Sequence, residues 1–180
     1  MIDQEKKELR RQIKELKQKV STEDKKIKSL IIFRKIEKLN EFKTSKTVMV
    51  YWSMDDEVYT HDFVLKWHKE KVIILPVVKE DELELRIFTG KDNMATGQSF
   101  GISEPKGEKF NKPEDIDLVI VPGIAFDSNN NRLGRGKAYY DKLLKKTKAY
   151  KIGICFDFQL IESVPVDEHD VKMDLVISNK

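Results

Sequence analysis

Five short, almost wholly apolar runs constrain this chain more than any other feature. They are TVMVYW (47–52), KVIILPVV (71–78), DLVIVPG (117–123), YKIGICF (150–156) and MDLVIS (173–178). Runs this short that are apolar at nearly every position are typical of strands buried on both faces. Segments with helical patterns stand between several of them. The alternation predicts an α/β fold with a mostly parallel open sheet that has helices on both faces.

The remaining segments complete one domain. HDFVLKWHKE (61–70) and YYDKLLKK (139–146) read as helices, whereas LELRIF (83–88) alternates and predicts an exposed-edge or hairpin strand. Residues 89–107 form the longest stretch without a regular pattern, and its length suggests a lid. Repeats, low-complexity tracts and Gly/Ser linkers are absent from the sequence. A length of 180 residues then predicts a single domain over 1–180.

The N-terminal segment predicts a helical, basic arm over residues 1–44 that packs on this domain. Leu9, Ile13, Leu16 and Val20 lie at spacings of four, three and four, which is one helical stripe. Ser21, with an acidic residue three positions on, is a good start for a second helix. Residues 1–47 hold 15 Lys/Arg against 8 Asp/Glu, while the whole chain has a net charge of only +3. Composition alone favours a solvated helix face, but nucleic-acid binding and an anionic site stay open.

Composition also indicates the cellular compartment in which the protein is expected. The chain is 39% hydrophobic and 36% charged, and its apolar runs are far shorter than the roughly 18 residues of a membrane span. MIDQEKKELRR at the N-terminus lacks the apolar core of a signal peptide. A single cysteine, Cys155, lies in an apolar run and is expected to be a buried thiol rather than a nucleophile. These features predict a cytoplasmic protein without a membrane partner.

NNNRLGRGKAYYD (129–141) is the segment that most suggests chemistry. It follows a predicted strand that ends at Pro122-Gly123, and ligands of open α/β sheets bind beyond the carboxyl ends of strands. Gly134 and Gly136 allow the backbone to approach an anion, and a helix start adds partial positive charge. Arg132, Arg135 and Lys137 add three full charges, and Asp141 could complement the helix dipole or hold Mg²⁺. Phosphate binding is favoured over an ordinary basic loop, although the P-loop spacing is absent.

Other candidates are weaker by spacing alone. Lys6 and Arg10 share one helix face, where salt bridges with Glu5 or Glu8 are the simpler interpretation. Trp52 is better explained as a core residue, and Glu57 is equally well a functional carboxylate or an ordinary loop acid. The polar residues of EHDVKMD (168–174), which include His169, Asp170 and Asp174, are more typical of a turn. His61 and His68 receive no role, and the spacings of a Ser/His/Asp triad or a zinc site are absent.

The segment 121–144, with VPGIAFD followed by NRLGRGKAYYDKLL, resembles the signature of the 5-formyltetrahydrofolate cyclo-ligase (methenyltetrahydrofolate synthetase) family. KKELR, YWSMDDEVYT, ILPVV, FGISEP, IDLVIVPG and VPVDEHDVKMD occur in the order of that family, so the resemblance spans nearly the whole chain. Ala138 departs from it, because the family usually has glycine there. We expect the added methyl group to narrow the loop or shift its backbone.

The resemblance implies a set of site residues and reverses the simpler interpretations given above. It implies ATP contact at Lys6, Lys7, Arg10, Arg132, Leu133, Gly134, Arg135, Gly136, Lys137, Ala138, Tyr139 and Tyr140. It implies folate contact at Trp52, Glu57, Arg135, Gly136, Lys137, Ala138 and Tyr139, and magnesium ligation by Asp141 and Asp170. Arg135 and Lys137 are the residues expected to act in catalysis.

The reaction that the resemblance implies is ATP- and Mg²⁺-dependent ring closure of 5-formyltetrahydrofolate to 5,10-methenyltetrahydrofolate. The resemblance admits a polyglutamylated form of the folate as substrate. Such phosphoryl-transfer chemistry depends on positioning and charge, which is consistent with the lack of a motif-spaced nucleophile. A monomer that binds no nucleic acid is expected. Two alternatives remain: an ATP-independent sugar-phosphate isomerase or phosphatase on a similar sheet, and an RNA-binding module that uses the basic arm.

Overall fold

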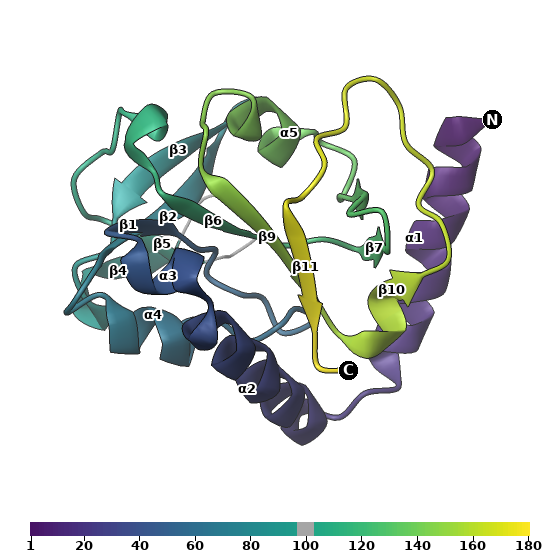
Figure 1. The fold of residues 1–180 in the computed structure, drawn as a ribbon, viewed down its shortest axis with the longest axis horizontal. Helices are drawn as coiled ribbons and strands as arrows, with labels where there is room; N and C mark the ends of the chain where they lie inside the picture. Colours follow the sequence, from purple (N-terminus) through teal and green to yellow (C-terminus); the bar gives the residue numbers. More distant parts are fainter. Residues whose placement is uncertain (97–102) are drawn as a thin grey trace.

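Six strands form the central sheet, in the order β11-β9-β6-β1-β2-β3 (Figure 1). The computed structural model describes residues 1–96 and 103–180. Its helices are α1 (Ile2–Gln18), α2 (Thr22–Lys38), α3 (Asn40–Thr44), α4 (His61–Trp67) and α5 (Tyr139–Leu144). Its strands are β1 (Thr47–Met49), β2 (Val72–Lys79), β3 (Glu82–Ile87), β4 (Met94–Thr96), β5 (Ser103–Pro105), β6 (Leu118–Val121), β7 (Ala125–Asp127), β8 (Arg132–Leu133), β9 (Tyr150–Cys155), β10 (Leu160–Ile161) and β11 (Leu175–Ser178).

The strand directions confirm the predicted α/β class. β11, β9, β6, β1 and β2 pair in parallel, and β3 alone is antiparallel, at the edge beside β2. This edge hairpin is the role that the alternating pattern of residues 83–88 predicted. The five apolar runs therefore supply the five parallel strands, and all five carboxyl ends point to the same side of the sheet.

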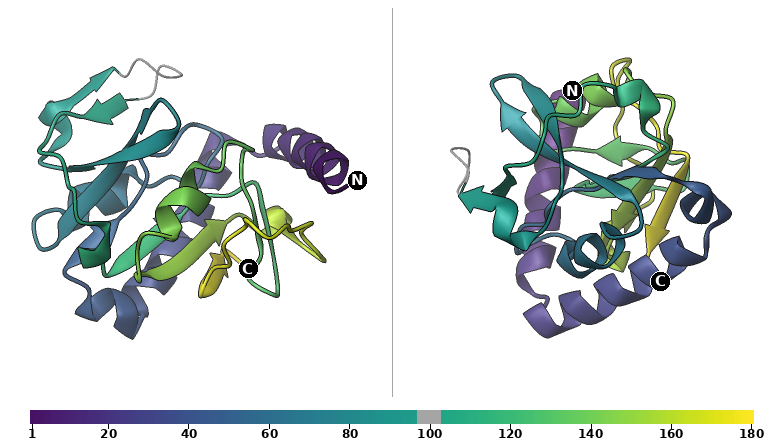
Figure 2. Two further views of the ribbon diagram at one scale, coloured as in Figure 1. Left: turned by 90° about the horizontal axis from the view of Figure 1, so that it is seen from above. Right: turned by 90° about the vertical axis from the view of Figure 1, so that its left-hand side faces the viewer.

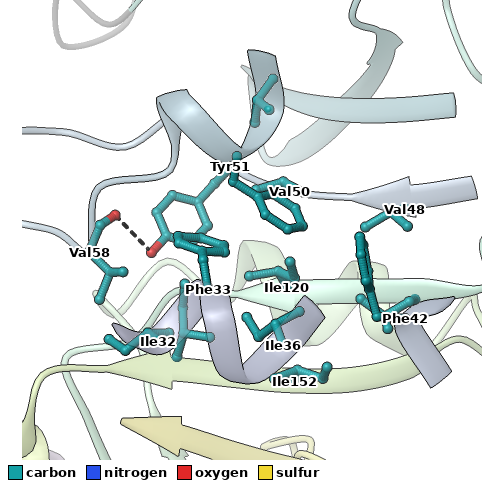
Figure 3. Packing of buried hydrophobic residues seen from close by; sticks show 14 of the residues in the cluster. Ile32, Phe33, Ile36, Phe42, Val48, Val50, Tyr51, Val58, Ile120 and Ile152 are labelled. Carbon is teal, nitrogen blue, oxygen red and sulfur yellow. Dashed lines mark hydrogen bonds between the residues drawn. The ribbon is translucent and has the colours of Figure 1, made fainter. Parts of the chain in front are cut away.

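Alternate residues of the inner strands enter two separate cores. In β6, Leu118 and Ile120 join the cluster formed with α2, α3 and α4, whereas Val119 and Val121 join the cluster that includes Leu143 of α5. Figure 3 shows the first cluster, where the side chains of α2 and α3 lie against those of β1, β6 and β9. Helices on both faces explain why these strands are apolar at every position.

A smaller sheet supports the N-terminal helix. It has the order β10-β7-β8, and α1 lies at the side of the molecule with β7 and β10, away from β3, β4 and β5 (Figures 1 and 2). Ile13 of α1 packs with Ala125, Leu133 and Val164. These strands were not predicted, because segments of two or three residues are too short to show a period.

The stripe predicted for the first helix is wrong in part. Ile13 is buried, but Leu16 is 38% exposed. The residues that α1 buries are Lys6, Ile13 and Lys17. Two of these three are cations, so an apolar stripe could not reveal the packed face. The helix is held against the body by a mixture of apolar contact and charge.

The second helix begins where the sequence predicted. Ser21 precedes α2, and its side-chain oxygen accepts a hydrogen bond from the backbone N–H of Asp24 at 3.1 Å. This contact satisfies one of the free donors at a helix start. Cys155 is fully buried in β9, as expected. None of the helices in residues 1–96 and 103–180 is long and apolar enough to cross a membrane.

The stretch 89–107 is more regular than predicted. β4 and β5 form an antiparallel pair within it, in which Ala95 is opposite Glu104. Three-residue strands with little apolar content give no clear period in a sequence, which explains why this pair was missed. The lid hypothesis for 89–107 falls in part on residues 97–102, which lie outside the described residues.

Candidate active site

The candidate site lies at the carboxyl ends of the parallel strands. Residues 50–57 follow β1, and Pro122-Gly123 follow β6, so both segments leave the sheet on the same side. A small cavity of about 10 Å³ lies between these segments, α1 and β9. It is lined by Lys17, Tyr51, Glu57, Val58, Pro122, Gly123, Ile154 and Gln159. The ends of three strands and one helix therefore meet here, as expected for a ligand site of an open α/β sheet.

Arg132 supports the loop between β8 and α5 from its buried side. Its guanidinium is buried, donates to the Pro122 carbonyl at 2.7 Å and lies 5.3 Å from the centre of the Tyr140 ring. Burial lowers the pKa of Arg132, and the nearby Asp141 carboxylate opposes this shift. A Cβ on Gly134 would come within 2.9 Å of the guanidinium. Gly134 is therefore required by the packing of Arg132, in addition to any approach of a ligand.

The exposed part of the loop contains the predicted catalytic cations. Arg135, Gly136, Lys137 and Ala138 are all exposed. Gly136 has a φ of +99°, and Ala138, which caps α5, has a φ of +56° in the left-handed region. A Cβ is strained in this conformation, which favours glycine at the position of Ala138.

Tyr139, Tyr140 and Leu133 flank the loop differently. The Tyr139 hydroxyl donates to the Glu80 carbonyl at 3.3 Å, so it ties α5 to the β2–β3 turn. Tyr140 lies against Arg132, and burial raises its pKa. Leu133, backbone included, is only 1% exposed, and its side chain belongs to the core with Ile13. Leu133 therefore lies inside the protein, unlike the exposed residues 135–138 that follow it.

The N-terminal helix contacts two loops through its cations. Lys6 Nζ donates to Asp167 Oδ2 at 2.7 Å and to Asp170 Oδ2 at 2.6 Å. Arg10 Nε donates to the Gly134 carbonyl at 2.9 Å. Among the described residues, neither cation pairs with Glu5 or Glu8, so the simpler salt-bridge interpretation is wrong.

Lys7 differs from its neighbour. It is exposed, although it precedes the partly buried Arg10 by one helical turn. Glu8 pairs with Arg11 on the outer side of α1, which leaves the inner face to Lys6 and Arg10. The structure thus brings Arg10 to the loop before α5 and Lys6 to Asp167 and Asp170, and it places Lys7 at the surface.

The Asp141 carboxylate contacts the backbone immediately after Asp170. Asp141 Oδ1 accepts from the Val171 backbone N–H at 3.0 Å, and Val171 directly follows Asp170. Among the described residues, no cluster of three or more His, Cys, Asp or Glu could hold a metal. Mg²⁺ bound with a nucleotide typically uses one or two carboxylates plus phosphate oxygens. Asp141 and Asp170 supply the number of carboxylates that kind of site uses, and too few for a cage made by the protein alone.

Trp52 stacks on a histidine that the sequence did not single out. The ring centroids of Trp52 and His61 are 3.7 Å apart at an interplanar angle of 12°, and Phe88 lies 5.8 Å from Trp52. His61 Nε2 is 3.0 Å from the Ser53 carbonyl, and burial lowers the pKa of His61. Trp52 is partly buried, so it serves the core and still presents part of its surface. A lone histidine near an aromatic residue gives no signal of such stacking in a sequence.

Glu57 lies at the inner end of the site. Its side chain is 11% exposed, and its Oε1 accepts from the Met54 backbone N–H at 2.9 Å. Arg135 approaches its Oε2 at 3.8 Å and the Asp56 Oδ1 at 3.4 Å. Burial raises the pKa of Glu57, which the Met54 hydrogen bond and Arg135 oppose. For Asp56, burial also acts to raise the pKa, but Lys17 and Arg135 outweigh it and the pKa is lowered.

Sequence reasoning missed Lys17 and its partner Asp56. Lys17 is buried, lines the cavity with Glu57 and places Nζ 3.4 Å from Asp56 Oδ2. The spacing of Lys6, Arg10, Ile13 and Lys17 is four, three and four, the same as that of the apolar stripe used to predict the helix. Reading cations together with apolar residues along α1 would have found Lys17.

Comparison with known proteins agrees with this geometry. A sequence model of the 5-formyltetrahydrofolate cyclo-ligase family matches residues 2–179. The 5-formyltetrahydrofolate cyclo-ligase of Mus musculus is 31% identical over 192 residues, which covers 98% of this chain and 94% of that protein. The NMR structure of Aquifex aeolicus 5,10-methenyltetrahydrofolate synthetase is 38% identical, with a TM-score of 0.87, and covers 97% of this chain and 90% of that chain.

A second solved structure is similar over the same length. The 5,10-methenyltetrahydrofolate synthetase of Mycoplasma pneumoniae is 28% identical, with a TM-score of 0.78, and covers 97% of this chain and 99% of that chain. Sequence and structural similarity therefore extend over nearly all of both chains and are not confined to one motif. The chain belongs to the 5-formyltetrahydrofolate cyclo-ligase family.

Proposed function

We propose that this protein closes 5-formyltetrahydrofolate to 5,10-methenyltetrahydrofolate in an ATP- and Mg²⁺-dependent reaction that releases ADP and phosphate. Family membership supports the folate substrate and the ring closure. One observation supports the proposed dependence on ATP: α1 meets the loop between β8 and α5. There Arg10 donates to the Gly134 carbonyl at 2.9 Å, beside the exposed residues Arg135 and Lys137. Cations, backbone N–H groups and a helix start at one point suit a triphosphate.

The chemistry explains why ATP is needed. The formyl oxygen of the substrate belongs to an amide and is a poor leaving group. Transfer of the γ-phosphoryl group to this oxygen forms an imino-phosphate, which N10 then attacks at the formyl carbon. The carbon–oxygen bond breaks, and the former formyl oxygen leaves within phosphate. Such a reaction needs alignment of the reacting groups and stabilisation of charge, and no protein nucleophile.

The exposed loop cations have the main catalytic role in this proposal. Arg135 and Lys137 offset the negative charge that develops on the γ-phosphoryl group. Gly136, Ala138 and Tyr139 line the boundary between nucleotide and folate. Arg132 stays buried beneath the loop and donates to the Pro122 carbonyl, which supports the shape of the loop. In this proposal the exposed backbone of the loop binds the phosphates.

The two ends of α1 serve two ligands. Lys6, Lys7 and Arg10 supply positive charge for the phosphates near Asp170. At the opposite end, Glu57 binds the folate by accepting hydrogen bonds, and the partly exposed ring of Trp52 contacts it. A Mg²⁺ ion held by Asp141 and Asp170 would neutralise phosphate charge when bound.

Isotope transfer tests the proposed reaction directly. Substrate that carries ¹⁸O in the formyl group is converted with MgATP, and the released phosphate is examined by mass spectrometry. The proposal predicts one ¹⁸O atom in phosphate for each methenyl product formed. Unlabelled phosphate would contradict the phosphorylated intermediate, while product formation without ATP would favour the ATP-independent class of enzyme.

A further inference from the structure

Lys17 is buried at the folate end of α1, and the reaction outlined above gives it no role. Its side chain is only 6% exposed, compared with 48% for that of Arg135. Lys6 and Lys17 are eleven residues apart, which is about 16 Å along a helix. One rigid helix therefore carries a cation to each end of the site.

Burying an ammonium group is costly unless an acid compensates it. Burial lowers the pKa of Lys17, and Asp56 and Glu57 act against this shift while Arg135 adds to it. Asp56 is the single side chain within hydrogen-bond distance of Lys17 in the described part of the chain, at 3.4 Å. The cavity of about 10 Å³ that Lys17 shares with Glu57 has room for about one water molecule. Such a water could connect the ammonium group to Glu57.

The charges at this end of the site are balanced by one exposed cation and one buried cation. Asp56 and Glu57 carry two negative charges, and Arg135 and Lys17 lie next to them. Arg135 stands on an exposed loop, and in the proposed function it turns to the γ-phosphoryl group. When it does so, the two acids lose their contact with Arg135. Lys17 is then the cation that remains beside Asp56 and Glu57.

We propose, on the basis of the proposed function, that Lys17 is a positioning residue for folate binding, the fixed counter-ion that holds Asp56 and Glu57 in place when Arg135 engages the nucleotide. It acts through Glu57 and does not touch the reacting atoms. Its loss should therefore weaken folate binding and leave ATP binding nearly unchanged. A merely structural role for Lys17 predicts a different result, because poorer packing of α1 would also disturb Lys6, Arg10 and hence ATP.

The test uses the full chain with Lys17→Met, Lys17→Arg and the control Lys14→Met, which changes an exposed lysine of the same helix. KM for 5-formyltetrahydrofolate and KM for ATP are measured separately by methenyl absorbance. For Lys17→Met we expect about a tenfold higher folate KM, which corresponds to about 1.4 kcal/mol, with ATP KM within about twofold. Lys17→Arg should restore folate KM to within about threefold, and Lys14→Met should match the wild type.

The pH profile adds a readout that packing alone would not move. Glu57 faces Asp56 in its own segment, Lys17 of α1, Arg135 of the loop, Tyr51 after β1 and Tyr140 of α5. Loss of the Lys17 charge raises the pKa of Glu57 further, so the acidic limb of kcat/KM for folate should move to higher pH in Lys17→Met. An unmoved limb, an unchanged folate KM or an equal rise in both KM values would overturn the proposal.

A second variant keeps the test decisive should Lys17→Met not fold. Asp56→Asn changes a half-exposed side chain and removes its negative charge. Lys17 is retained, and Glu57 is then the acid beside its ammonium group. The acidic limb should then move to lower pH, and a limb that stays in place would overturn the proposal. Wild-type turnover is measured first: its absence contradicts the proposed function, whereas normal turnover with an unaffected Lys17→Met contradicts only the role of Lys17.

Discussion

Lys6 and Asp170 form an ion pair of 2.6 Å across 164 residues of sequence, and this pair fixes the first helix against the last loop of the chain. Asp167 accepts from the same ammonium group at 2.7 Å. Burial acts to lower the pKa of Lys6, but the bonds to the two carboxylates outweigh it and the pKa is raised. Because Asp170 is also a proposed magnesium ligand, the pair links the stability of the fold to the metal site.

Replacement of Lys6 by Met should make stability depend on magnesium. The change leaves Asp170 and Asp167 without their cation, and we expect a loss of about 2 kcal/mol, less than for a fully buried pair because Asp167 is partly exposed. Mg²⁺ should raise the melting temperature of Lys6→Met more than that of the wild type, since it can replace the missing charge. Lys14→Met is the control, and equal shifts in all three proteins would contradict the proposed site.

Lys137→Ala tests the catalytic role of the loop. We expect kcat/KM to fall about 100-fold, or roughly 2.7 kcal/mol, because a charge that stabilises the transferring phosphoryl group is lost. Lys142→Ala is the matched control, since that lysine lies in α5 and donates to the Asp81 carbonyl at 3.1 Å. It should stay within about twofold. A loss below about threefold for Lys137→Ala, roughly 0.7 kcal/mol, would show that Lys137 does not act in catalysis.

Ala138→Gly should stabilise the fold. Ala138 has a φ of +56°, and the left-handed conformation is strained for a residue with a Cβ. We expect a gain of about 1 kcal/mol, or about 2–4 °C in melting temperature. Ala95→Gly, in strand β4, should lose about 0.5–1 kcal/mol, as glycine does in a regular strand. Destabilisation by both changes would mean that the loop does not hold Ala138 in this conformation.

Glu57→Gln should also stabilise the fold, at the expense of folate binding. Burial raises the pKa of Glu57, so its ionised form disfavours folding at neutral pH, and this cost disappears as the pH falls through the raised pKa. The amide retains the oxygen that accepts from Met54, and a gain of about 1 kcal/mol is expected near neutral pH.

Thermal unfolding at several pH values checks this prediction. The gain of Glu57→Gln should shrink toward acid, where the wild-type carboxyl is itself protonated. Glu114→Gln, at an exposed position, should change stability by less than about 0.5 kcal/mol at every pH. A gain that is the same at all pH values would contradict the assignment to ionisation.

Much of the fold could be predicted, because burial on both faces leaves an unambiguous pattern. The continuous apolar runs at β6 and β9 identified central parallel strands, and alternation at residues 83–88 identified the edge hairpin. β7 and β8 could not be found in this way, since they are two or three residues long. Asp127 at the end of β7 accepts from the N–H groups of Asn129, Asn131 and Val164, a network that no periodicity reveals.

The site was only partly predictable for a similar reason. Glycines and cations before α5 indicated an anion loop, and the family resemblance supplied Glu57 and Asp170. Spacing could not show that Arg132 is buried beneath Gly134 or that Lys17 reaches Asp56, because both depend on how α1 and β8 pack. A buried cation looks the same in a sequence as a solvated one.

The most direct test of the account is methenyl formation from 5-formyltetrahydrofolate, followed by absorbance in three samples. One contains MgATP, one lacks ATP and one lacks Mg²⁺. We predict product in the complete sample alone, with one ADP formed for each methenyl group. Product without ATP, or none in the complete sample from folded protein that binds ATP, would contradict the proposed reaction.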